Sequence, residues 1–310
     1  MFSIIEVRTM PFPVQVRIEH LTGHQCRISP LRGERCIGTG AWRMQDGGEV
    51  PCPFCPERIP TDTPLFPSGE RVCVGESVTF PNMYPFSAFH IVTVITRSHA
   101  PGPFSIRQIA DALAAQWSVL GEVQGYASIN WNHLSSAGAS MPHPHMQGIA
   151  DPEPTAYTRR CLEGGARYRE KTGKNYWETF IESERSGPRH IFGSEVPWCA
   201  HPVPLGEKEI RAYLPTGALS EAEPYIDTLA SGLHRVIGFY RERGHCAYNV
   251  ALRFDREHSG GDFRAFLSII ARVNPTPAGT SDSAFMERLH SEPVLFTIPE
   301  DLPLLFADRR

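Results

Sequence analysis

Residues 140–150 read SMPHPHMQGIA, and this stretch carries the strongest pattern in the 310-residue sequence. It is expected to form a β-strand, in which alternate side chains share a face, so that His143, His145 and Gln147 project together. The loop before it, SSAGAS at 135–140, consists of small residues that let a ligand approach the backbone. A surface histidine pair beside prolines is the alternative interpretation, but the small-residue loop and the apolar residues that follow favour a binding site.

The middle histidine of this group, His145, is the predicted catalytic nucleophile. Neutral imidazole is available at pH 7, and its adduct with phosphorus is reactive enough to serve as an intermediate. Attack on the α-phosphorus of a nucleoside diphosphate sugar would expel a sugar phosphate and leave the nucleoside monophosphate on the protein, from which a second sugar phosphate would collect it. The amide of Gln147 is neither an acid nor a base, but it can hydrogen-bond a phosphoryl oxygen and hold the adduct.

A metal site is indicated by Cys52 and Cys55 in PCPFCPE, a C-x-x-C knuckle that can offer two thiolates from one turn. A redox dithiol is the alternative, but such motifs usually open a helix, and the prolines around this pair favour a rigid knuckle. Tetrahedral zinc needs two further ligands, and the sequence offers His99 and His143. The other cysteines are scattered and are expected to be structural thiols.

Around these motifs the sequence alternates short strands with helical segments. In the first half, hydrophobic periodicity predicts a helix at 105–126 and strands at 16–30, 71–77, 86–96 and 126–134. The second half repeats this order more weakly, with a strand-like segment, a helix, a strand, a glycine-rich loop and a strand at 197–215, 220–244, 246–254, 259–263 and 263–273. An internal duplication is the economical explanation. Residues from about 151 to 190 would form the connection, part of it a helix.

The composition excludes several classes of protein. A formal net charge of −4 argues against a nucleic-acid coat, which normally carries a basic excess. Hydrophobic residues make up 41% and charged residues 21%, as in ordinary soluble proteins, and no segment approaches the ~20 apolar residues that span a bilayer. The first residues lack the pattern of an export signal. We therefore expect a cytoplasmic protein with neither nucleic-acid nor membrane partners.

Polar residues elsewhere offer contacts for an anionic substrate. Arg32 and Arg35, in ISPLRGERC, are three residues apart and can turn toward one anion if the loop is helical. Taken alone, such a pair is usually solvated surface. Asn82 and Asn132 carry no signal singly, because asparagine is common in turns.

Taken in order along the chain, these motifs resemble the galactose-1-phosphate uridylyltransferase family, a branch of the histidine-triad superfamily. The matching positions are SPLRGER at 29–35, CPFC at 52–55, Asn82, His99, Asn132, Ser140 and HPHMQ at 143–147. The resemblance implies an α+β fold of two histidine-triad-like repeats, each an antiparallel sheet with packed helices, and usually a homodimer. Residues 1–153 would form the repeat with the zinc site and the nucleophile, and residues 154–310 a degenerate repeat with acceptor and dimer contacts.

The same resemblance assigns roles to individual residues. His145 corresponds to the covalent nucleophile, Gln147 to the glutamine that replaces the third histidine of the triad, and Ser140 to a serine that contacts the substrate phosphates. Nucleotide or phosphate contacts are implied for Arg32, Arg35, Asn82 and Asn132. Structural zinc ligands are implied at Cys52, Cys55, His99 and His143. Four protein ligands leave no open position, so the metal would hold the loop that carries the nucleophile rather than attack substrate.

The chain also departs from the family pattern. It has Trp131, Asn132 and His133 where the family usually has Glu-Asn-Arg, and its strand at 263–273 lacks the histidines that often lie there, so only one metal site is predicted. The predicted activity is transfer of a nucleoside monophosphate between a nucleotide sugar and a sugar 1-phosphate. One alternative is a phosphorylase or hydrolase of nucleotide sugars or dinucleoside polyphosphates that uses the same histidine. Another is a zinc-stabilised nucleotide-binding module without catalysis.

Overall fold

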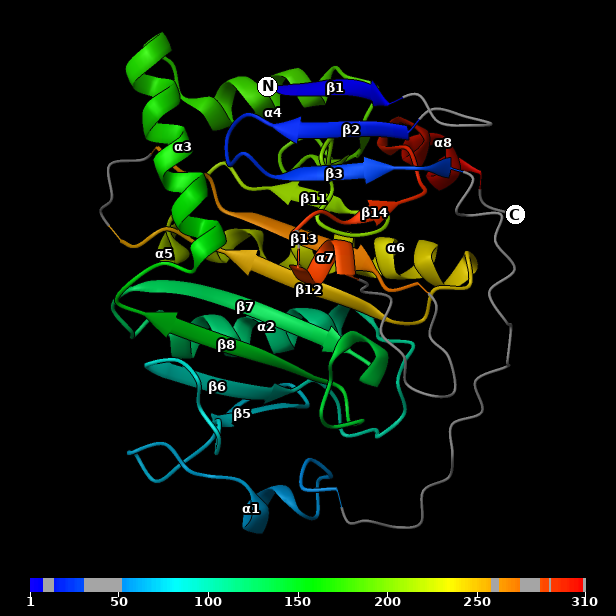
Figure 1. Ribbon diagram of the computed structural model, residues 1–310. Coiled ribbons are helices and arrows are strands. Elements are labelled where there is room, and N and C mark those ends of the chain that lie inside the picture. The colour runs from blue at the N-terminus through cyan, green and yellow to red at the C-terminus, as the bar shows by residue number, and fades with distance from the viewer. Residues whose placement is uncertain (8–13, 31–51, 258–261, 274–284, 290, 309–310) are drawn as a thin grey trace.

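The computed structural model describes residues 1–310 except 8–13, 31–51, 258–261, 274–284, 290 and 309–310 (Figure 1). Its main feature is a ten-stranded sheet in which every neighbouring pair is antiparallel. The strands, in their order across the sheet, are β4 (Val72–Val74), β5 (Ser77–Pro81), β6 (Phe89–Val94), β8 (His145–Asp151), β7 (Tyr126–His133), β12 (Tyr248–Arg253), β13 (Phe266–Ala271), β11 (Ile210–Tyr213), β10 (Trp198–Ala200) and β9 (His190–Phe192).

The order of elements repeats about the centre of this sheet. Each half runs through three strands, a long helix and two further strands, and the halves meet where β7 pairs with β12, with Asn132 opposite Asn249. The repeated order agrees with the predicted duplication, and the α+β class with antiparallel sheets is confirmed. The division at residues 153 and 154 stays a prediction.

Two long helices pack side by side on one face of the sheet, behind it in Figure 1. Helix α2 (Ile106–Leu120) begins with a capping box between Ser105 and Gln108 and covers the first half, whereas α6 (Ile226–Glu242) covers the second. Both are amphipathic, and their apolar sides join the inward side chains of the strands in the largest buried cluster. The helix expected at 105–126 is therefore confirmed, although it ends at Leu120.

Two further helices cover the opposite face over the second half. Helices α3 (Ala156–Thr172) and α4 (Tyr176–Arg185), in the segment predicted to connect the repeats, pack there against β10, β11 and β13 in a second apolar cluster. Short elements complete the fold: α1 (Ile59–Asp62), α5 (Leu219–Ala222), α7 (Phe285–Leu289), α8 (Leu302–Ala307) and 3-10 turns at Ser135–Ala137, Glu223–Tyr225 and Pro299–Asp301. None of the helices in the described ranges combines the length and the apolar character that crossing a membrane requires.

A small second sheet joins the two ends of the chain. It contains β1 (Phe2–Val7), β2 (Val14–Glu19), β3 (Gln25–Ile28) and β14 (Val294–Leu295), with β3 and β14 parallel. The single strand expected at 16–30 is thus a hairpin, since the chain turns between β2 and β3 through Gly23, whose φ of 73° suits glycine. This sheet packs beside the second half, where the buried Arg17 pairs with Glu300 at 2.8 Å. On the same face of the first half, the segment with Phe54 and Ile59 packs on β5 and β6, and the predicted site lies beside it.

Candidate functional site

Strand β8 carries the predicted nucleophile at its first residue. It lies between β6 and β7, with His145 opposite Val94 and Gln147 opposite both Val92 and Asn130. His145 and Gln147 line one pocket of about 370 Å³, as alternation along a strand predicts. The prediction that His143 shares this face was wrong, because the strand begins only after Pro144 and His143 turns toward the cysteines instead.

The ring of His145 is held in one orientation. Its Nδ1 lies 2.9 Å from the carbonyl oxygen of His143 and must donate to it, so in the neutral ring Nε2 bears the lone pair. The residue is only 4% exposed, and the ring of Phe54 packs edge-on against it at 5.2 Å. Burial lowers the pKa of His145, although the bond to the carbonyl acts in the opposite sense. Within the described ranges Nε2 has no hydrogen-bond partner, so the ring is a buried, neutral imidazole with an available lone pair.

The pocket combines apolar walls with a polar end. The polar end is that of the strand residues His145 and Gln147, and the same pocket is bordered by Ser140, at the end of the small-residue loop, and by Asp62, Thr63 and Asn82. The apolar walls come from the cysteine knuckle, the segment after α1, strands β5 and β6 and the loop between these strands: Phe54, Pro64, Phe80, Met83, Tyr84 and Val92. Such a cavity suits a flat ring on one side and a charged group at the polar end. Of the residues predicted to act on substrate, the structure therefore brings His145, Gln147 and Ser140 into one place.

The predicted substrate contacts differ in their surroundings. Asn82 borders the pocket, but its amide is engaged, since Oδ1 accepts from the backbone of Tyr84 at 2.9 Å and Nδ2 lies 3.0 Å from His90 Nε2. Asn132 is absent from the residues lining this pocket, and its Oδ1 accepts from Asn249 Nδ2 at 2.7 Å. Asn82 thus holds the backbone beside the pocket, whereas Asn132 contacts the second half of the sheet. The two predicted phosphate ligands, Arg32 and Arg35, lie outside the described residues.

One residue beside the pocket was missed by the sequence analysis. His90, on β6, places Nε2 2.9 Å from Oε1 of Gln147. It is 5% exposed and lies beneath the ring of Phe86, whose centre is 4.3 Å away. A single histidine in a β-branched strand gives no signal by itself. Only the pairing of β6 with β8 brings it to the site.

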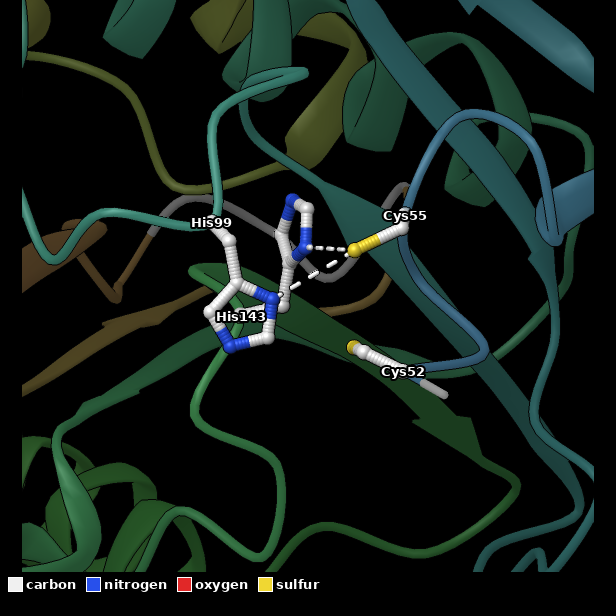
Figure 2. A group of neighbouring side chains, drawn as sticks. All are labelled: Cys52, Cys55, His99 and His143. Carbon is white, nitrogen blue, oxygen red and sulfur yellow. Dashed lines mark hydrogen bonds between the residues drawn. The ribbon is translucent and has the colours of Figure 1, made fainter. Parts of the chain in front are cut away.

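Four side chains predicted as metal ligands do gather in one group, shown in Figure 2. The ligand atoms of Cys52, Cys55, His99 and His143 all lie within 4.8 Å of one another. Cys55 Sγ is 3.4 Å from His99 Nδ1 and 3.8 Å from His143 Nδ1, close to the ~3.4–3.8 Å between ligands around tetrahedral zinc. These donors come from the knuckle, the segment after β6 and the segment before β8, so a bound metal would join three parts of the chain.

The surroundings of the group also fit a cation. His143 uses its other ring nitrogen to donate to the carbonyl oxygen of Thr96 at 2.8 Å, which directs Nδ1 toward the cysteines. Burial, and after it the nearby Cys52, raises the pKa of Cys55, so two thiolates are unfavourable there without a positive charge between them. The four residues can therefore hold a metal ion.

The chain resembles known proteins in sequence and in fold. No family model matches the sequence. A curated relative, an uncharacterised protein from Archaeoglobus fulgidus, is 27% identical over 304 residues, which cover 93% of this chain and 90% of that protein.

Three solved structures, each 18% identical in sequence, share the fold. An ADP-glucose phosphorylase from Arabidopsis thaliana with bound ADP-glucose superposes with a TM-score of 0.76 over 96% of this chain and 99% of its own. A galt-like protein from the same plant gives 0.74 over 95% and 99%, and a uridylyltransferase gives 0.68 over 94% and 96%. The fold predicted from the motif resemblance is therefore confirmed: this chain has the architecture of the uridylyltransferase structures.

Proposed function

We propose that this protein is a nucleotidyltransferase that carries a nucleoside monophosphate on His145. The observation that carries the proposal is the buried, neutral imidazole, which has an available Nε2 lone pair and lines, together with Gln147 and Ser140, a pocket of about 370 Å³. The shared fold of a uridylyltransferase and a nucleotide-sugar phosphorylase supports the proposal. His145 and Gln147, the proposed nucleophile and a proposed phosphate-binding residue, lie on one strand at this pocket. A binding module without catalysis is therefore the weaker interpretation.

The proposed reaction has two displacements at phosphorus. The Nε2 lone pair attacks the α-phosphorus of a nucleotide sugar, and the bond from this phosphorus to the bridging oxygen breaks, so that the sugar 1-phosphate departs with the electron pair. An oxygen of the acceptor phosphate then attacks the same phosphorus and breaks the bond to Nε2, which recovers its lone pair. In both steps Nδ1 keeps its hydrogen and donates it to the carbonyl oxygen of His143, which stabilises the positive charge that the ring acquires.

Gln147 and Ser140 would bind the phosphoryl oxygens during these steps. An amide N–H and a hydroxyl are neutral donors, so they stabilise the oxygen charge without forming an ion pair that would slow release. Ser140 follows a loop that is braced from the second half, where Asn249 donates to the carbonyl oxygen of Ala137 at 2.7 Å. The second repeat would in this way keep the phosphate-binding loop in place.

Zinc is the metal proposed for the cysteine and histidine group, because two thiolates and two imidazoles form a usual structural zinc site. Its proposed role is structural. His143 would bind the ion through Nδ1, and the carbonyl oxygen of the same residue accepts from His145. A fixed His143 would therefore fix the nucleophile's orientation.

The second substrate distinguishes two candidate activities. A sugar phosphate as acceptor makes the protein a transferase, as the motif resemblance implies, whereas inorganic phosphate makes it a phosphorylase. The second candidate is favoured by the ADP-glucose phosphorylase among the structures of the same fold. Both activities pass through the same adduct on His145. A homodimer and a cytoplasmic location remain predictions.

The experiment is to incubate the protein with nucleotide sugars labelled in the α-phosphate and carrying uracil, adenine or guanine. One of them should leave acid-labile, base-stable label on the protein, and His145→Ala should abolish it. His190→Ala is the control, since it removes a histidine that bonds only a turn at the far edge of the sheet. Release of the label by phosphate or by a panel of sugar phosphates then identifies the acceptor. Label retained in His145→Ala would reject the proposal.

A further inference from the structure

We propose that His90 is a positioning residue that fixes the amide of Gln147 with its NH2 group toward the substrate phosphate. The inference deepens the proposed function and rests on it. It assigns a role to a histidine that the motif resemblance leaves without one. The argument starts from the hydrogen bonds around the ring.

The protonation of the ring follows from its neighbours. The backbone N–H of Phe86 donates to Nδ1 of His90 at 3.4 Å, so Nδ1 is the unprotonated nitrogen. In a neutral ring Nε2 then carries the hydrogen and donates to Oε1 of Gln147 at 2.9 Å. Burial lowers the pKa of His90, whereas Gln147 and Asp151 act in the opposite sense, and the net direction favours this neutral ring.

The opposite tautomer satisfies fewer groups. Asn82 Nδ2 also lies 3.0 Å from Nε2 and could donate to it if the hydrogen were on Nδ1. That arrangement would set the Phe86 N–H against a second donor and leave the Gln147 carbonyl facing a lone pair. The Nε2–H tautomer has one cost of its own: Asn82 cannot flip, because its Oδ1 already accepts from Tyr84, so its Nδ2 and the Nε2–H are two donors 3.0 Å apart. With the Gln147 amide as it stands, the Nε2–H tautomer makes two hydrogen bonds and opposes one pair of groups, whereas the alternative makes one hydrogen bond and opposes two pairs.

The tautomer decides which end of Gln147 a substrate meets. With Oε1 bonded to His90, the amide nitrogen is the atom left for the pocket, and in the described part of the chain it has no partner. A flipped amide would instead present its carbonyl oxygen to an anionic phosphoryl oxygen, which is repulsive. His90 thus provides preorganisation: it holds a donor where charge develops, although it does not touch the reacting atoms itself.

A double-mutant cycle tests whether His90 acts through Gln147. We expect His90→Ala to slow nucleotidylation of His145 by about 10- to 100-fold, mostly in kcat, as the loss of one oriented donor would. The double variant with Gln147→Ala should be no slower than Gln147→Ala alone, because the two act as one unit. His90→Gln, whose Nε2 can occupy a similar position and donate, should recover most of the rate. Additive losses, or a His90→Gln variant as slow as His90→Ala, would overturn the proposal.

A second measurement does not depend on activity or on variants that fold poorly. Nitrogen-15 spectra of the histidine-labelled wild-type protein report the tautomer of each ring, and His90 is expected to carry its hydrogen on Nε2. A hydrogen on Nδ1 would refute the role whatever the kinetics show. Label on wild-type protein tests the nucleotidyltransferase proposal separately, so failure of one proposal is distinguishable from failure of the other.

Discussion

Cys52→Ser, which removes one of the proposed metal ligands, should unfold the segment 52–63 while the main sheet and its helices stay folded. This segment contains the knuckle and α1, and its apolar contacts are few. Ile59 is buried and Phe54 half-buried, and together they pack on side chains of β5 and β6 in a small cluster separate from the main core.

A rough balance shows why the metal matters here. Ordering about a dozen residues costs at least about 12 kcal/mol, at ~1 kcal/mol for each backbone. Burying Ile59 and part of Phe54 returns about 4 kcal/mol. Backbone hydrogen bonds in the turn and helix, at ~1 kcal/mol each, return several more. The sum is near zero, so the proposed structural zinc, worth about 10–16 kcal/mol, would decide whether the segment stays ordered.

Hydrogen–deuterium exchange is the assay. In Cys52→Ser, and in wild type treated with a chelator, amides of 52–63 should exchange as fast as an unstructured peptide, and nucleotidylation should be lost. Amides of α2 and α6 should keep their protection. Cys246→Ser is the matched control, because it removes an exposed thiol outside the group. Unchanged protection of 52–63 in the metal-free protein would refute the reasoning, and so would loss of protection throughout the molecule.

Three further predictions concern the frame around the site. A Cβ at Gly232 would lie 2.1 Å from the buried ring of Trp198, so Gly232→Ala should lower the free energy of unfolding by about 3 kcal/mol in urea titration. Gly238→Ala, on the same helix with open space around it, should raise that free energy by about 0.5–1 kcal/mol, and equal effects would contradict the packing. Burial, and after it a nearby arginine, lowers the pKa of His133 from 6.5 to about 4. As the pH drops, His133 therefore takes up a proton in the unfolded chain before it does so in the folded one. The free energy of unfolding should fall by about 3 kcal/mol between pH 6.5 and pH 4, and the fall should be shallower in His133→Gln. Asn249→Ala removes two donated hydrogen bonds at the small-residue loop and should cost about 2 kcal/mol and slow nucleotidylation, whereas an unchanged rate would show that the loop needs no brace.

Much of the fold follows from local patterns in the sequence. The long helices and most strands of the main sheet lie where periodicity predicts them, because each has one apolar side that another layer covers. Strands β5 and β9 were not predicted as separate strands, and the segment 197–215 forms two strands, β10 and β11. The small sheet was not predicted, since β3 pairs with β14 across most of the chain and neither strand shows by itself where it will pair. The buried pair of Arg17 and Glu300 has the same origin: its partners meet only after the chain ends have folded together.

The site was predictable where its residues are close in sequence or match a motif. His145 and Gln147 share a strand, and Cys52 and Cys55 share a turn, so spacing alone brings each pair together. His90 could not be found in this way, because its role comes from a neighbouring strand more than fifty residues from Gln147. The prediction that His143 shares a face with His145 was wrong. It extended the alternation of the strand back across Pro144, where the strand has not yet begun.

The most direct test of the central claim is to locate the covalent adduct. The protein would be quenched in base after brief exposure to the nucleotide sugar that labels it, digested, and analysed by tandem mass spectrometry with a fragmentation method that spares phosphoramidates. We predict one nucleoside monophosphate on His145, in the peptide containing residues 140–150. An adduct on any other residue, or turnover of the nucleotide sugar without an adduct, would contradict the account.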